Sequence, residues 1–236
     1  MDSKDSLGDR MKSYERDYER QLMKFVPGII RLDGRGFHSV CKALALAKPY
    51  SIILMDVMND ITKALIDETN AVVGFTQSDE ITLVLYTDKP NSQVYFDGKV
   101  NKINSILPSI ASSMFAARLR TVQFDCRSFS VPTKWEAINC LIWRQQDATR
   151  NSIQMVARTY FSHKACEGRS CDDLQEMLWQ DYHINWNDYP AGFKRGRFFV
   201  RGQTEMLSLP PLTKLVNPVE VIFDRAEAVL KEEVIV

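Results

Sequence analysis

Two acidic residues follow apolar segments and are flanked by small residues. Asp33 ends an apolar run that begins at Val26 and precedes Gly34, and Asp79 follows Ser78 between two further apolar runs. An ionised carboxylate at the end of a buried strand needs hydrogen-bond donors or a cation to offset its desolvation. A metal site shared by the two acids is therefore the economical interpretation. Each acid alone is also typical of an ordinary turn, since Asp-Gly and Ser-Asp-Glu are common in hairpin loops.

The order of the predicted elements brings these acids together. The apolar patterns predict strands at about 26–33, 71–77, 81–86 and 122–131, with helices at about 51–69 and 94–118. This βαββαβ order is the split βαβ unit of ferredoxin-like folds. Its first and third strands are antiparallel neighbours, so the end of one adjoins the start of the other. We therefore expect an α+β fold with a polymerase-palm core and with Asp33 and Asp79 at one rim.

Carboxylate oxygens without a local histidine pair favour Mg²⁺ over zinc. Two Mg²⁺ ions about 3.5 to 4 Å apart assist in-line displacement at phosphorus by activating the attacking oxygen and stabilising the leaving pyrophosphate. Glu80 is a secondary catalytic candidate, because strand alternation turns it away from Asp79. The glycine-rich turn at 34–38 offers backbone N–H groups that suit a triphosphate.

Four segments carry a family resemblance. They are RLDGRGFH at 31–38, AKP at 47–49, GFTQSDE at 74–80 and WRQ at 143–145. In this order and spacing they closely resemble the signature segments of the tRNA(His) guanylyltransferase family, over roughly residues 5 to 205. The resemblance implies ATP-dependent activation of a tRNA 5′ end, followed by attack of the 3′ hydroxyl of GTP or another NTP. Nucleotides are thus added in the 3′ to 5′ direction.

The resemblance and the motifs together give a set of expected site residues. The expected catalytic residues are Asp33, Asp79 and Glu80. The expected metal ligands are Asp33, Asp79 and the backbone carbonyl of Gly34, which the resemblance alone supplies. The expected nucleotide-binding residues are Asp33, Gly34, Arg35, Gly36, Phe37, His38, Lys48, Ser78 and Asp79.

A basic segment near the C-terminal end is a candidate RNA-binding element. It interleaves Lys194, Arg195, Arg197 and Arg201 with aromatic residues. Such a strand sets cations against phosphates while a ring stacks on a base, although a solvated edge strand protected by charge fits the pattern equally well. The further RNA-binding candidates are Arg144, Arg150 and Asn151.

The chain of 236 residues is 45% hydrophobic and is long enough for one large domain or two small ones. Its pattern changes from strand-rich to helix-rich near residue 132 without a linker. We expect a palm-like segment at 1–131 packed against a helical segment at 132–236, which includes the basic strand and the C-terminal tail. A last short helix is predicted at about 225–231.

A first amphipathic helix is predicted before the first strand, with Ser6 and Asp9 forming a capping box. Its apolar stripe is assigned to the core rather than to a subunit interface. The stripe consists of Leu7, Met11, Tyr14, Tyr18, Leu22 and Phe25.

Bulk properties restrict the partners. Basic and acidic residues both number 30, so attraction to tRNA must come from local patches. No long apolar span or targeting signal is seen, and the five scattered cysteines are typical of a reducing compartment, so we expect a cytoplasmic protein without membrane contact. The family resemblance implies a homotetramer.

Two rival functions share parts of this pattern. A nucleotide cyclase has the same core and the same pair of Asp residues, and a non-enzymatic RNA-binding module has the ferredoxin-like core alone. Within the family, one departure affects the substrate. Eukaryotic guanylyltransferases carry a His-Ile-Asn-Asn type motif after the WRQ segment, whereas Thr149 stands here in place of the histidine. This pattern resembles the guanylyltransferase-like proteins, which implies template-directed repair of 5′-truncated tRNAs instead of addition of one untemplated guanylate.

Overall fold

The computed structural model describes residues 6–203, 205–207, 209–228, 230 and 231. The strands are β1 (Gly28–Gly34), β2 (Val73–Gln77), β3 (Glu80–Leu85), β4 (Phe124–Ser130) and β5 (Arg197–Val200). The α-helices are α1 (Leu7–Arg16), α2 (Phe37–Ala43), α3 (Ile52–Thr69), α4 (Val100–Arg118), α5 (Lys134–Tyr160), α6 (His163–Cys166), α7 (Cys171–Tyr182) and α8 (Ala191–Arg195). Short 3₁₀ turns lie at Tyr95–Gly98, Trp186–Asp188 and Leu212–Lys214, and a π-helical turn lies at Glu220–Asp224.

The strands form one antiparallel sheet in the order β4-β1-β3-β2-β5. The first four are the predicted βαββαβ unit, and β1 pairs with β3 so that Asp33 lies opposite Glu80. The palm-like fold is therefore confirmed. β5 comes from the C-terminal segment and extends the sheet beyond β2, with Arg197 opposite Thr76. The two predicted segments thus share one sheet.

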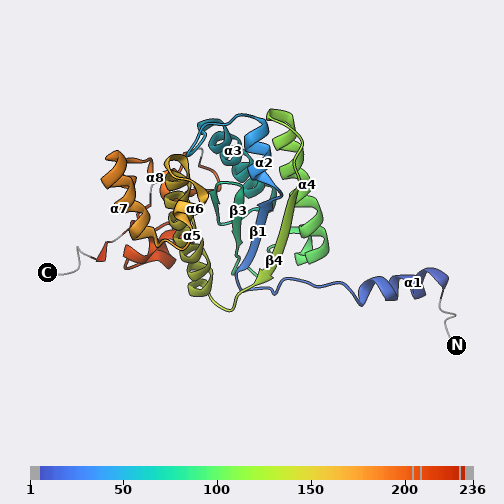
Figure 1. The fold of residues 1–236 in the computed structure, drawn as a ribbon. Helices are drawn as coiled ribbons and strands as arrows, with labels where there is room; N and C mark the ends of the chain where they lie inside the picture. Colours follow the sequence, from blue (N-terminus) through green and yellow to red (C-terminus); the bar gives the residue numbers. More distant parts are fainter. Residues whose placement is uncertain (1–5, 204, 208, 229, 232–236) are drawn as a thin grey trace.

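Helices cover the sheet from two sides (Figure 1). On one side, α3 and α4 pack on the side chains of Ile30 and Leu32, while on the other side α5 packs over Ile29. Successive strand residues point to opposite faces, so continuous apolar runs in β1 and β3 supply both cores. The helices on both faces thus hold the central strands in place. They thereby also position the end of the sheet that carries Asp33.

Polar caps set the starts of the main helices where the sequence predicts them. The Ser51 side chain accepts from the Leu54 amide at 3.3 Å, and Thr133 accepts from the Glu136 amide at 3.1 Å. Ser170 and Asp173 form a reciprocal capping box at the start of α7. Each cap satisfies an amide that has no partner inside the helix.

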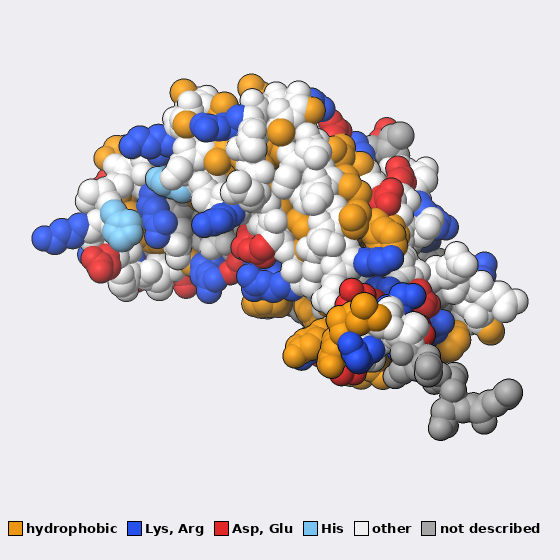
Figure 2. Space-filling model, turned by 90° about the vertical axis from the view of Figure 1, so that its right-hand side faces the viewer, with side chains coloured by type: hydrophobic (Ala, Val, Ile, Leu, Met, Phe, Trp, Pro, Cys, Tyr) orange, Lys and Arg blue, Asp and Glu red, His pale blue; other side chains and the backbone are white. Residues whose placement is uncertain are grey.

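The prediction that the first helix packs into the core is wrong. Ser6 does cap α1, but α1 has no buried residue and projects away from the body (Figure 1). In the stripe, only Leu22 is buried, whereas Tyr18 is 81% exposed. Figure 2 shows hydrophobic side chains gathered on this projecting segment. A helix that follows its capping signals still needs a partner surface to bury its apolar face.

The C-terminal tail also differs from the prediction. The helix expected at 225–231 is absent from 225–228, and the helical turn ends earlier, at Asp224. Arg225 follows with a left-handed backbone (φ 60°), which ends the turn. Within the described part of the chain, no helix is both long and apolar enough to cross a membrane.

Candidate active site

Two tight backbone features deliver the carboxylates to the rim. Ser78 has a left-handed backbone (φ 53°) in the two-residue turn between β2 and β3, and Asp79 follows it. The Gly34 amide donates to the Asp79 carbonyl at 3.2 Å, which ties the end of β1 to this turn. A Cβ atom on Gly34 would lie 2.2 Å from the Phe37 ring and 3.0 Å from the Asp79 Cβ, so only glycine fits. The predicted meeting of the two segments is therefore present.

Three acids form a row across neighbouring strands at this rim. Asp33 on β1 lies opposite Asp125 on β4 and opposite Glu80 on β3. Like charges directly opposite one another destabilise a sheet. Asp125 is compensated by Arg127 at 3.6 Å and Glu80 by Arg144 at 2.6 Å. Within the described residues, Asp33 has no cation at ion-pair distance.

The neighbouring Asp79 carboxyl experiences the same excess of negative charge. Burial, and secondly the charge of Asp33, raise the pKa of Asp79 to about 6. Two carboxylates that remain without a basic partner are a donor set suited to a divalent cation with oxygen ligands. In the described part of the chain, no group of three or more His, Cys, Asp or Glu side chains is arranged for a metal. The set therefore fits Mg²⁺ only with a further oxygen, such as the Gly34 carbonyl.

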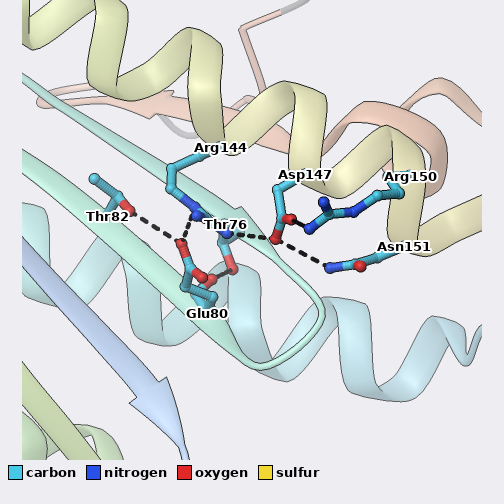
Figure 3. A network of polar contacts seen from close by, with 7 residues as sticks. All are labelled: Thr76, Glu80, Thr82, Arg144, Asp147, Arg150 and Asn151. Atoms are coloured by element: carbon cyan, nitrogen blue, oxygen red, sulfur yellow. Dashed lines mark hydrogen bonds and ion pairs between the residues drawn. The ribbon is translucent and has the colours of Figure 1, made fainter.

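Glu80 belongs to a polar network between β3 and α5 (Figure 3). The Arg144 side chain is buried and joins two acids, because its Nε lies 2.6 Å from Glu80 Oε1 and its Nη2 lies 2.6 Å from Asp147 Oδ2. The Glu80 contact is an ion pair without an aligned hydrogen bond, since Nε has no hydrogen-bond partner in the described structure. Asp147 also accepts from Arg150 and Asn151. The network turns Glu80 toward α5 and holds it there.

The turn after Asp33 has mixed exposure. Arg35, His38 and Lys48 are exposed beside the rim, whereas Phe37 is buried with its ring 5.1 Å from that of Phe115. The side chain of Phe37 is therefore not available to a nucleotide, and this residue can contact one through its backbone alone. The Arg35 amide is already bound to the Gln123 carbonyl at 2.8 Å.

Lys48 and Asp79 both act on the Cys41 thiol. Burial and Asp79 raise the pKa of Cys41, and Lys48 opposes them. Cys41 is therefore within electrostatic reach of both an expected metal ligand and an expected phosphate contact. Ser78, also expected at the site, donates to Asp79 and works against the rise in its pKa.

The basic segment contradicts the prediction of an exposed RNA-binding strand at two of its residues. Arg197 is 4% exposed and donates to Asn59 Oδ1 at 2.5 Å and to the Gly192 carbonyl at 3.2 Å. Lys194 is 7% exposed and donates to the Asn187 carbonyl. Since β5 is a buried strand next to α3 and α8, these two cations serve the fold. Neither of the two interpretations from the sequence, an RNA-binding strand or a solvated edge strand, applies to these two residues.

The other candidates from this segment remain accessible. Arg195 is partly exposed, with its guanidinium 5.3 Å from the Trp186 ring centre. Arg201 is exposed and donates to Asn70 Oδ1 at 2.9 Å.

Trp143, although part of the WRQ segment, and two further acids are absent from the set of expected site residues. Trp143 is 50% exposed, and its ring lies 5.3 Å from the guanidinium of Arg31 and 4.2 Å from that of Arg144. Asp125 and Asp147 complete the charge balance of the rim and the network. Two signals in the sequence could have identified these acids. Strand pairing places Asp125 next to Asp33, and helical spacing places Asp147 one turn after Arg144.

Comparison with known proteins agrees with this geometry. The family model described as tRNAHis guanylyltransferase matches residues 8–135, which is more than half of the chain. The tRNA(His) guanylyltransferase of Schizosaccharomyces pombe is 26% identical over 211 residues, with 80% of this chain and 79% of the relative covered.

Solved structures give the same result. A bacterial tRNA(His) guanylyltransferase-like protein in complex with ATP is 34% identical, with a TM-score of 0.85, 92% of this chain and 99% of that chain covered. A GTP complex of such a bacterial protein is also 34% identical, with a TM-score of 0.77, covering 89% of this chain and 95% of that chain. The palm-like fold, the paired acids at its rim and these matches together show that the chain belongs to the tRNA(His) guanylyltransferase family.

Proposed function

We propose that this protein is a Mg²⁺-dependent 3′ to 5′ nucleotidyltransferase that repairs the 5′ end of truncated tRNAs under the direction of the opposing strand. ATP first activates the 5′ monophosphate, and GTP or another NTP is then added. Family membership and the ATP and GTP complexes of bacterial relatives support the choice of substrates. Family membership also argues against a nucleotide cyclase.

The uncompensated pair Asp33 and Asp79 carries this proposal. Asp125 and Glu80 each have an arginine at ion-pair distance, so the acids left for cations are the two that the sequence predicts as ligands. With the Gly34 carbonyl they would hold Mg²⁺, which would activate the attacking oxygen and stabilise charge on the leaving group, pyrophosphate in the ATP step and AMP in the transfer of the NTP. Without a cation, this rim repels phosphates, which disfavours a role as a passive RNA-binding module.

The neighbouring residues orient the triphosphate in this proposal. Lys48 neutralises phosphate charge, and Arg35 and His38, which are exposed as Lys48 is, supply further donors. Phe37 takes part only by fixing the turn from the core. Positioning supplies much of the catalysis of such a transfer, because no covalent intermediate with a side chain is needed.

Glu80 acts as a positioning residue in this scheme. It pairs with Arg144 and thereby connects the strand that carries the rim to α5. Through Asp147 the same network orients Arg150 and Asn151, which we propose as RNA contacts together with Arg195 and Arg201. Arg144, Lys194 and Arg197, which were also predicted to bind RNA, are not part of this set, because all three are buried within the chain.

Thr149 supports templated addition over untemplated guanylylation. Its hydroxyl donates to the Gln145 carbonyl at 2.9 Å within α5, so it bonds to its own helix. No imidazole is available at this position to place a guanine, and pairing with the opposing base then selects the nucleotide.

Steady-state kinetics tests this assignment. The substrates are a tRNA lacking its first 5′ nucleotide, tested with each NTP, and full-length tRNA(His). We expect the complementary NTP to give a higher kcat/KM than guanine addition opposite A, since this ratio reports differential binding of the transition states. Use of GTP whatever the opposing base, with full-length tRNA(His) as the better substrate, would make the protein a dedicated guanylyltransferase.

We also propose a homotetramer in the cytoplasm. The apolar stripe of α1 is exposed in the single chain, and a second copy is a suitable partner because large exposed apolar patches mark interaction sites. All five cysteines are free thiols, in keeping with a reducing compartment.

A further inference from the structure

A cavity of about 560 Å³ lies at the end of the sheet opposite the Asp33–Asp79 rim. Its walls include Gly28 at the start of β1 and Leu85 at the end of β3, whereas the rim lies at the other ends of these strands. Six residues of strand separate Gly28 from Gly34, which at about 3.3 Å per residue is about 20 Å. The cavity is therefore separate from the proposed active site. Its size is in the range of small-molecule sites.

Cations outnumber acids around this cavity. The lining contains Lys89, Lys134, Arg201 and Arg225 against Asp88 and Asp224. Lys134 pairs with Asp224 at 3.5 Å, and its ammonium lies 4.8 Å from the centre of the Tyr86 ring. For Arg201 and Arg225, by contrast, the described residues provide no carboxylate within ion-pair distance.

Both guanidinium groups are held in place by neutral oxygens. Arg201 donates to Asn70 Oδ1 at 2.9 Å, and Asn70 is the left-handed cap at the end of α3. Arg225 donates to the backbone carbonyls of Val72 and Ile222. These anchors fix the side chains beside one another without neutralising their charge.

The two arginines also influence one another. Burial, and then the nearby positive charge of Arg201, lower the pKa of Arg225. Two like charges held together in a cavity are stabilised by an anion that bridges them.

We propose that Arg201 and Arg225 bind a phosphate group in this cavity, at a second anion site remote from the catalytic rim. Phosphate is the class of anion because the substrates of the proposed function, on which this inference rests, all carry it, and because guanidinium groups bind phosphate oxygens in a bidentate manner. The source of the phosphate is either the backbone of a bound tRNA or a free nucleotide.

Binding measurements on the full-length protein test the site and identify the source. Arg201→Ala removes one exposed guanidinium, and Arg201→Lys keeps its charge. Arg158→Ala is the matched control, since Arg158 is likewise exposed and donates only to a side-chain amide oxygen, that of Gln154 at 3.4 Å. Arg225→Lys is a second variant, with its thermal unfolding measured first because Arg225 also anchors backbone carbonyls.

Two titrations are made with each variant, tRNA at several salt concentrations and ATP by calorimetry. If the phosphate belongs to tRNA, Arg201→Ala lowers the slope of log K against log salt by about 0.7 to 0.9 and leaves ATP binding unchanged. If it belongs to a nucleotide, the variant loses one class of ATP site and keeps the tRNA slope, and Arg201 then leaves the proposed set of RNA contacts. In either case Arg201→Lys, which keeps the charge but not the bidentate guanidinium, loses less binding than Arg201→Ala, and Arg158→Ala is unaffected.

The inference is overturned if Arg201→Ala and Arg225→Lys, both folded, match the wild type in both titrations, or if Arg158→Ala changes them as much. Failure of the proposed function gives a different result. In that case Arg201→Ala still binds tRNA or ATP differently from the wild type, but the wild type transfers no nucleotide in Mg²⁺.

Discussion

Replacing Asp79 with asparagine should stabilise the metal-free protein at neutral pH while abolishing nucleotide transfer. Asp79 is charged at pH 7.5 although its environment opposes the charge, because burial and Asp33 raise its pKa from 3.8 to about 6. A group whose pKa is higher in the folded state contributes stability below its unfolded pKa, and this contribution is lost as the pH rises through the folded value. The wild type therefore loses stability between about pH 4 and pH 6.

The size of the effect follows from the shift of about 2 units. At about 1.4 kcal/mol per unit, the charged Asp79 costs up to about 3 kcal/mol at pH 7.5, an upper limit because the rim is partly solvated. For a chain of this length, 1 kcal/mol corresponds to about 2–4 °C in Tm, so Asp79→Asn should raise Tm by up to about 10 °C in EDTA.

Thermal unfolding of the wild type and of Asp79→Asn at pH 4.5 and pH 7.5, with and without Mg²⁺, measures the difference in Tm. The difference in Tm should shrink at pH 4.5, where Asp79 is protonated, and Mg²⁺ should stabilise the wild type but not the variant. Asp125→Asn is the control, because Asp125 is an exposed acid opposite Asp33 on β4 and should change stability by less than about 0.5 kcal/mol. An Asp79→Asn variant with the wild-type Tm at pH 7.5, or with retained activity, would refute the reasoning.

Three further predictions concern other parts of the molecule. Arg144→Met should destabilise the protein by up to about 3–5 kcal/mol, because it leaves the half-buried Glu80 without its cation. Chemical denaturation measures this loss, and the double variant Arg144→Met/Glu80→Gln should recover stability. Arg197→Ala should lower the free energy of unfolding by about 2–4 kcal/mol without changing the salt slope of tRNA binding, and a changed slope with unchanged stability would return Arg197 to the RNA-binding set. Leu7→Ser combined with Tyr14→Ser should dissociate the proposed tetramer in sedimentation experiments, whereas a mass equal to that of the wild type would remove α1 from the interface.

Local patterns in the sequence were enough to predict most of the strands and helices and the position of the two acids. Alternating and continuous apolar runs give the strands, and the side chains of Ser51, Thr133 and Ser170 begin their helices as predicted. These signals are local, because a cap or a period depends on residues only a few positions apart. The βαββαβ order then left one way for the ends of β1 and β3 to meet, so the rim was predictable.

Which charged side chains and apolar surfaces are accessible depends on long-range contacts that the folded structure reveals. Arg197 is buried and bonds to Asn59, 138 residues earlier, and Glu80 is held toward α5 by an arginine on that helix. The stripe that starts in α1 has the periodicity of a core helix, but α1 itself buries none of its residues. A residue type states what a side chain can bind, whereas its burial and its partners depend on contacts between segments far apart in sequence, which no local pattern encodes.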